Sequence, residues 1–223
     1  MQSLPSRRAF LSQVGKSMVV ASIGLAAAQE MGLVSRALAL DDEDRLTFGE
    51  DERLVSFIQE TPSEKLLPLL HEKWKSGTSL KDLVGAAALA NARAFGGEDY
   101  VGFHTLMALM PAYHMSCELP DNEAPLPVFK VLYRNAQRLD ETGGHAADVL
   151  KVVKPLEEAS LGDFDVREAV RRVDGEAAER ILAAFVERGA KEAFNALLRE
   201  VADFTEVHRV NISYRAWDLL SVV

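Results

Sequence analysis

The helical spacing of apolar residues is the feature that most constrains the fold of this chain. From residue 51 onward, leucine, alanine, valine and phenylalanine recur at intervals of three and four, as they do on one face of an α-helix. No segment convincingly alternates apolar and polar residues in the way that a half-buried strand requires. The sequence therefore predicts an all-α fold, a multi-helix array or bundle.

Glycine, proline and capping residues divide this pattern into separate helices. Thr61 is followed by Pro62 and, three residues on, by Glu64, which predicts a helix start capped by Thr61. An alanine-rich helix is expected over residues 80–95, ending at Gly96. Further helices are expected over residues 102–117, 128–139, 146–161 with an interruption at Pro155, 165–175, 176–188 and 190–223.

The last predicted helix is still apolar at Val223, where the sequence stops without a glycine, a proline or a basic last turn. Two explanations stay open at this point. Either this end of the chain is docked into the core, or the chain is the front part of a longer helical protein, which we slightly favour.

The first 39 residues have the order of an export signal. Arg7 and Arg8 precede Phe10 and Leu11, residues 18–28 are apolar, and residues 37–39 read Ala-Leu-Ala. The apolar run is shorter than the roughly 20 residues that span a bilayer. We therefore expect a twin-arginine signal peptide over residues 1–39, cleaved after Ala39, with export to the periplasm or otherwise through that pathway. The alternatives are an amphipathic helix of the mature fold and an uncleaved anchor.

Behind this leader we expect a flexible acidic arm over residues 40–50 and a helical domain over residues 51–223. The leader carries four basic residues and one acid, so removing it changes the net charge from −9 to −12. Nucleic acid and anionic membranes both favour a basic surface, so neither is an expected partner. Cys117 is the only cysteine, which excludes an internal disulfide. No second apolar run is long enough to span a membrane.

The stretch from Gly102 to Cys117 concentrates the residues that could bind a metal. His104 and Met107 are three apart, as are His114 and Cys117, so each pair can share a helix face. His104 and His114 are ten residues apart, about 15 Å along a straight helix, unless Pro111 bends it. Imidazole, thioether and thiol groups suit copper, and imidazole with thioether suits haem iron. A covalent c-type haem is excluded because no C-x-x-C-H motif is present.

A second candidate group lies in the last predicted helix. Its core stripe continues into His208, Asn211 and Arg215, where apolar residues would be expected. Buried polar groups must be hydrogen-bonded or bind something, and Arg215 is suited to a carboxylate, such as a haem propionate or an acid of the chain itself. If His208 faces His104 or His114, a site between helices follows. Glu206 is expected to lie too far round the helix to contact His208.

Each of these residues also has a structural explanation, as core filling or as part of a network that fixes helix register. Two hypotheses therefore stand. The first is an exported protein that binds copper, iron or non-covalent haem through His104, His114, His208 and Cys117, with Met107, Asn211 and Arg215 around the cofactor, in redox chemistry as an enzyme or a carrier. The second is a cofactor-free protein that acts by contact, as an accessory subunit beside a redox partner.

The segments GFHTLMALMPAYHMS and EVHRVNISYRAWDLL resemble a family of twin-arginine-exported, all-helical bacterial proteins without an established activity. The first segment is also similar to a histidine-bearing helical region beside some Rieske proteins and to questin-oxidase-like proteins. The resemblance implies export, a helical fold and a chain that continues past Val223. It assigns no catalytic residue.

Overall fold

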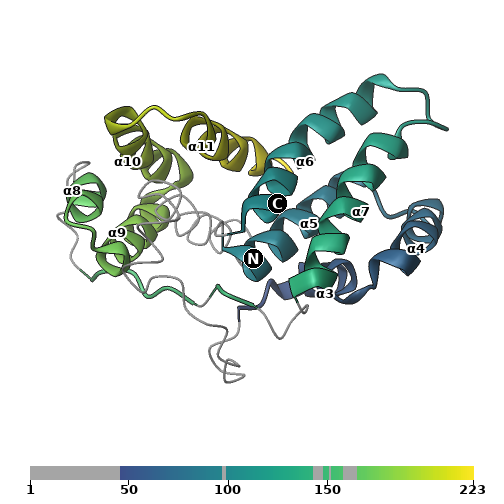
Figure 1. The fold of residues 1–223 in the computed structure, drawn as a ribbon, viewed down its shortest axis with the longest axis horizontal. Coiled ribbons are helices and arrows are strands. Elements are labelled where there is room, and N and C mark those ends of the chain that lie inside the picture. Colours follow the sequence, from purple (N-terminus) through teal and green to yellow (C-terminus); the bar gives the residue numbers. More distant parts are fainter. Residues whose placement is uncertain (1–45, 97–98, 143–147, 151, 158–164) are drawn as a thin grey trace.

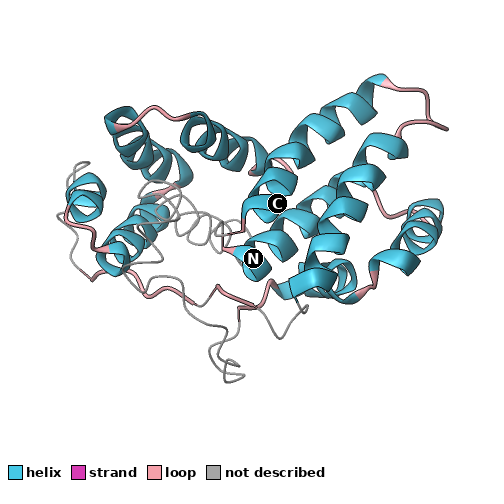
Figure 2. Ribbon diagram, viewed as in Figure 1, coloured by secondary structure: helices cyan, strands magenta, loops and turns pink. Residues whose placement is uncertain are grey.

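The structure is a computed structural model that describes residues 46–96, 99–142, 148–150, 152–157 and 165–223. Within these ranges the regular elements are nine α-helices and one 3₁₀ turn, with no strand, which confirms the all-α prediction (Figure 2). The helices are α3 (Glu52–Glu60), α4 (Ser63–Lys75), α5 (Leu80–Phe95), α6 (Tyr100–Glu118), α7 (Pro125–Thr142), α8 (Asp165–Arg171), α9 (Gly175–Arg188), α10 (Ala190–Asp203) and α11 (Val207–Leu219).

The helices form two groups that meet along α6 and α11 (Figure 1). In the first group, α6 packs against both α5 and α7, and α3 and α4 cover the far side. In the second group, α10 packs against α8, α9 and α11. α11 crosses to contact α6, and we call this contact the α6–α11 seam.

α5 is the central helix of the first group, and residues 83–95 of it are all buried. Its many alanines allow neighbouring helices to approach closely. Ser79 and Asp82 form a capping box at its start. Gly96 ends it in the left-handed conformation with φ 55°, as the sequence predicted.

The C-terminal residues dock onto α5. Val222 is buried, and its carbonyl oxygen lies against the bare Cα of Gly85. A Cβ at Gly85 would collide with that oxygen, so glycine is required for this close approach. The chain beyond α11 therefore ties the second group to the central helix of the first.

The single helix predicted over residues 190–223 is wrong. α10 ends at Asp203, Phe204 is extended with φ −150° and ψ 89°, and α11 begins at Val207. Phe204, which the predicted helix would include, is 59% exposed. Glu206 causes the restart because its side chain accepts hydrogen bonds from the first free backbone amides of α11.

Two other local predictions also fail. The described parts of the helix predicted over residues 146–161 are not helical, and there the amides of Val149 and Leu150 donate instead to the carbonyl of Arg93. Thr61 does not cap α4. Its hydroxyl donates to the carbonyl of Phe57 and so closes the end of α3.

The predicted signal peptide, residues 1–39, lies outside the described residues. The predicted flexible arm, residues 40–50, is described only from Leu46. There Leu46 and Phe48 are buried, and the Phe48 amide donates to Glu52, so this stretch belongs to the folded domain. Among the residues described, no helix is both long and apolar enough to cross a membrane.

Candidate functional site

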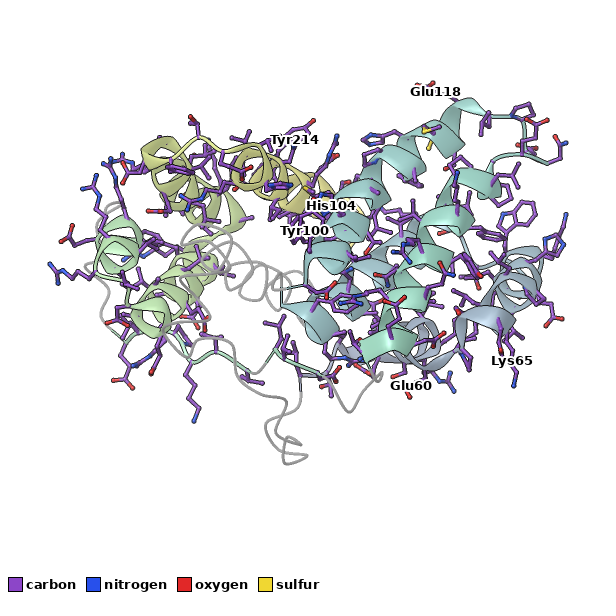
Figure 3. The ribbon with its side chains drawn as sticks, viewed as in Figure 1. Glu60, Lys65, Tyr100, His104, Glu118 and Tyr214 are labelled. Carbon is purple, nitrogen blue, oxygen red and sulfur yellow. The ribbon has the colours of Figure 1, made fainter. Side chains whose placement is uncertain are left out.

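Two of the predicted ligand residues meet at the α6–α11 seam. The rings of His104 on α6 and His208 on α11 lie 5.2 Å apart between centroids and meet edge to face at 78°. Figure 3 shows His104 and Tyr100 where α11 approaches α6, at the middle of the molecule. We call His104 and His208 the histidine pair.

A backbone carbonyl of its own helix orients His104. The Nδ1–H of His104 donates to the carbonyl oxygen of Tyr100, 2.6 Å away and one turn earlier. This hydrogen bond fixes the tautomer and leaves Nε2 as the nitrogen with a lone pair.

The carboxylate of Glu206 orients His208. The Nδ1–H of His208 donates to Glu206 Oε1 at 2.8 Å, and the His208 amide donates to Oε2 at 2.9 Å. The expectation that Glu206 lies too far round to contact His208 is therefore wrong. Glu206 is the extended cap before α11 and not a residue of the helix, so its side chain folds back over the first turn.

Glu206 is held in its charged form. Partial burial raises the pKa of this carboxyl, but hydrogen bonds from the amide and ring of His208 outweigh burial and lower that pKa below its ordinary value. Both imidazoles of the histidine pair thus donate Nδ1–H to an oxygen. No described residue is hydrogen-bonded to either Nε2. Histidines that bind metals in proteins characteristically have this arrangement.

Aromatic rings surround the histidine pair. Phe103 lies 4.5 Å from the His104 ring and 5.3 Å from the His208 ring, so it forms an apolar wall beside both. Tyr100 lies 4.4 Å from His104 and 6.1 Å from His208 and is 61% exposed. The site is therefore shielded on one side and open to solvent on the other.

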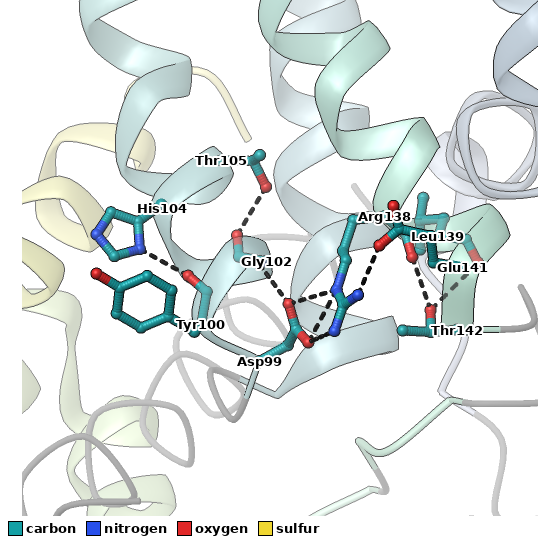
Figure 4. A network of polar contacts seen from close by, with 9 residues as sticks. All are labelled: Asp99, Tyr100, Gly102, His104, Thr105, Arg138, Leu139, Glu141 and Thr142. Atoms are coloured by element: carbon teal, nitrogen blue, oxygen red, sulfur yellow. Dashed lines mark hydrogen bonds and ion pairs between the residues drawn. The ribbon is translucent and has the colours of Figure 1, made fainter.

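An ion pair fixes the first turn of α6. The carboxylate of Asp99 caps this turn by accepting from the Gly102 amide at 2.7 Å and also accepts three close hydrogen bonds from the Arg138 guanidinium of α7 (Figure 4). Burial raises the pKa of Asp99, but the Arg138 hydrogen bonds outweigh it and the net pKa lies below the ordinary value. The turn that carries Tyr100 and His104 is thereby held against α7.

A buried amide network supports the same turn from α5. Asn91 donates to the Gly102 carbonyl at 2.8 Å, to Thr105 and to Asn135. Asn91 and its neighbour on α5, Arg93, are both fully enclosed in the core. Asn91 contributes to the site by positioning α6.

His114 and Cys117 lie apart from the histidine pair. His114 and Cys117 are exposed near the other end of α6, beside Glu118, which Figure 3 places far from His104. α6 runs as one helix through Pro111, so His104 and His114 remain about 15 Å apart along its axis. Met107 is half-buried against the core.

The predicted residues of α11 lie along the flank of its core face. Asn211 and Arg215 are half-buried. Arg215 pairs with Asp218 of its own helix at 3.3 Å and lies over the ring of Tyr214. This agrees with the structural alternative, in which Arg215 binds an acid of the chain itself.

Within the described ranges, no three histidine, cysteine, aspartate or glutamate side chains form a group that could hold a metal ion. Among the described residues, these side-chain types thus offer the histidine pair without a third ligand. Comparison of the chain with protein-family models, curated proteins and solved structures finds no match. The family resemblance of the two segments therefore remains a prediction.

Sequence reasoning missed Glu206, Tyr100 and Phe103 as parts of the site. Tyr100 and His104 are four residues apart, a spacing that places them on one helix face and could have indicated their contact. No sequence signal of this kind pointed to Glu206, because the apolar helical spacing continues through it.

Proposed function

We propose that this is an exported helical protein that binds a single metal ion at the α6–α11 seam and uses it in redox chemistry. The ion that we propose is copper. The observation that carries the proposal is the histidine pair: two imidazoles from different helices, each with Nδ1 bound to an oxygen and Nε2 without a hydrogen bond to any described residue. The predicted twin-arginine signal, whose cargo crosses the membrane already folded, adds to the expectation of a bound cofactor.

The spacing of the rings supports one ion bound by both histidines. With bonds of about 2.0 Å and ligand angles of roughly 90–110°, two imidazoles on one ion have centroids about 4.5–5.2 Å apart. The distance between His104 and His208 is 5.2 Å. Two axial imidazoles of a haem would lie opposite each other, with centroids about 6.4 Å apart. The pair therefore fits a bare ion better than a haem.

The ligand type favours copper among the divalent ions. Imidazole sites bind Cu²⁺ more tightly than the other first-row divalent metals. Solvent reaches one side of the pair, through Tyr100, so further coordination positions are open to water or to a small substrate. An open position is the feature that distinguishes reactive metal sites from purely structural ones.

A copper titration of the purified chain tests the proposal. We expect one Cu²⁺ per chain, binding lost in His104→Ala and His208→Ala, and binding kept in His114→Ala, which removes an exposed histidine of the same helix. Copper at a hundred times its Kd should raise the free energy of unfolding by about 2.7 kcal/mol, seen as a higher melting temperature. A folded protein whose melting is unchanged by copper and by chelators would contradict the proposal.

A second candidate function, a cofactor-free protein that acts by contact with a redox partner, is favoured by one surface. α11 exposes an apolar stripe at helical spacing, formed by Val207, Val210, Tyr214 and Trp217. Tyr214→Glu would place a charge in this stripe and should abolish partner binding, whereas a chelator should not. Partner binding that survives Tyr214→Glu would contradict this alternative.

A further inference from the structure

We infer that Tyr100 is a third ligand of the ion, bound through its phenolate oxygen. This inference rests on the proposed function, because it assigns a ligand to the same ion that the histidine pair would hold. The described residues add no further histidine, acid or thiol to the histidine pair as a third ligand. A phenolate ligand explains how such a site can hold a metal.

The position of the ring carries the inference. A phenolate bound at about 2 Å puts its ring centre roughly 4.3 Å from the ion, so its centroid lies about 4–6 Å from those of imidazoles on the same ion. Tyr100 lies 4.4 Å from His104, inside this range, and 6.1 Å from His208, at its upper limit. The two spacings are compatible with a common ion.

The direction of the side chain agrees with this. Figure 4 shows the hydroxyl of Tyr100 and the second ring nitrogen of His104 on the same side of α6, both pointing toward α11. That nitrogen is Nε2, because Nδ1 is the one bonded to the Tyr100 carbonyl. The Tyr100 hydroxyl makes no hydrogen bond to any described residue, so binding an ion would break none of those contacts.

The ligand set of two neutral imidazoles and one phenolate fits Cu²⁺, which takes nitrogen and oxygen ligands in tetragonal geometry. On binding, the Tyr100 O–H bond breaks, its proton goes to solvent, and an O–Cu bond forms with no change in oxidation state. Electron density moves from phenolate to Cu²⁺ when the complex absorbs light. Such a complex has a charge-transfer band in the visible region, which imidazole ligands alone do not produce.

The test is a titration of the full chain with copper(II) sulfate, followed by visible absorption and by the number of protons released. We expect a visible band that saturates at one copper per chain. Tyr100→Phe keeps the ring against His104 and removes only the oxygen, so it should still bind one copper but lose the band and release one proton fewer. Tyr214→Phe is the matched control, because Tyr214 is also an exposed tyrosine but lies on α11, and this variant should keep the band.

Three outcomes would overturn the inference. A charge-transfer band that persists in Tyr100→Phe would show that another residue produces it. Stoichiometric copper binding to the unaltered chain without the charge-transfer band would leave the histidine pair as the site and remove Tyr100 from the ligands. No copper binding at all would overturn the proposed function, and this inference with it.

Discussion

Glu206 is the residue on which the orientation of His208 depends. Its carboxylate accepts from both the amide and the ring of His208, so it starts α11 and selects the ring tautomer at once. A neutral amide in its place can still accept a hydrogen bond but loses the charge that makes the ring a stronger ligand.

Glu206→Gln should therefore weaken copper binding about 10- to 100-fold while the fold is kept. Calorimetric titration with Cu²⁺ measures this change. Glu187→Gln, an exposed acid on α9, is the control and should bind as the unaltered chain does. Equal affinity in both variants would show that Glu206 only caps the helix.

Arg93 is the residue on which the core of the first group depends. Its side chain is fully buried and binds Glu52 at 2.8 Å. It also donates to Gln59 and to the Leu46 carbonyl, and it lies 3.7 Å from the carboxylate of Asp148. Removing one partner of a buried ion pair leaves the other partners unsatisfied.

Arg93→Met should lower the free energy of unfolding by about 3 kcal/mol or more. Arg172→Met breaks the exposed pair with Glu168 and should cost less than about 1 kcal/mol. Urea denaturation of the two variants compares them directly. A similar small loss in both would mean that the buried network adds little to stability.

At the scale of the helix, the first turn of α6 is the element that positions the site. It carries Tyr100, Phe103 and His104, and Asp99 both caps it and ties it to Arg138 of α7. The sequence predicted this helix and its histidines from spacing alone. It could not predict the tie to α7, because that contact joins residues 39 positions apart.

Asp99→Ala should cost about 1–2 kcal/mol of stability at pH 7 and weaken copper binding, because the turn that carries His104 is loosened. Asp174→Ala removes the equivalent cap of α9 and should leave copper binding unchanged.

The pKa of Asp99 is lowered in the folded state. The contribution of Asp99 to stability is therefore present above the ordinary value of 3.8 and is lost as the pH falls through the lowered pKa. The stability gap between Asp99→Ala and the unaltered chain should close in that acid range. A gap that persists there would contradict the role of the charge.

For the whole molecule, the seam between the two groups brings the site together. α11 contacts α6, and the residues after α11 dock onto Gly85 of α5.

Gly85→Ala should displace Val222 and lower the free energy of unfolding by about 1–3 kcal/mol. It should also weaken copper binding, since α11 would shift relative to α6. Chemical denaturation and copper titration of this variant measure both effects. Unchanged copper affinity would show that the contact between Val222 and Gly85 does not determine how α11 packs against α6.

The helical class and most helix positions could be predicted because apolar spacing is a local property of the sequence. The break between α10 and α11 could not, because a cap at Glu206 competed with a continuous helical pattern and prevailed. The sequence could not predict that His104 and His208 lie side by side, and it supported a site between helices only if they did. Their contact depends on how two helices about 100 residues apart in sequence pack. His114 shows the limit of spacing arguments, because it shares the helix of His104 but lies far from α11.

The central claim is that His104 and His208 bind one ion together, and pulsed electron paramagnetic resonance of the copper-loaded chain tests it most directly. The remote ring nitrogens of bound imidazoles modulate the electron spin echo, so the number of histidines on the copper can be counted. We predict two imidazoles in the unaltered chain and one in any copper that His208→Ala still binds. A single imidazole in the unaltered chain, or two that remain after His208→Ala, would contradict the account.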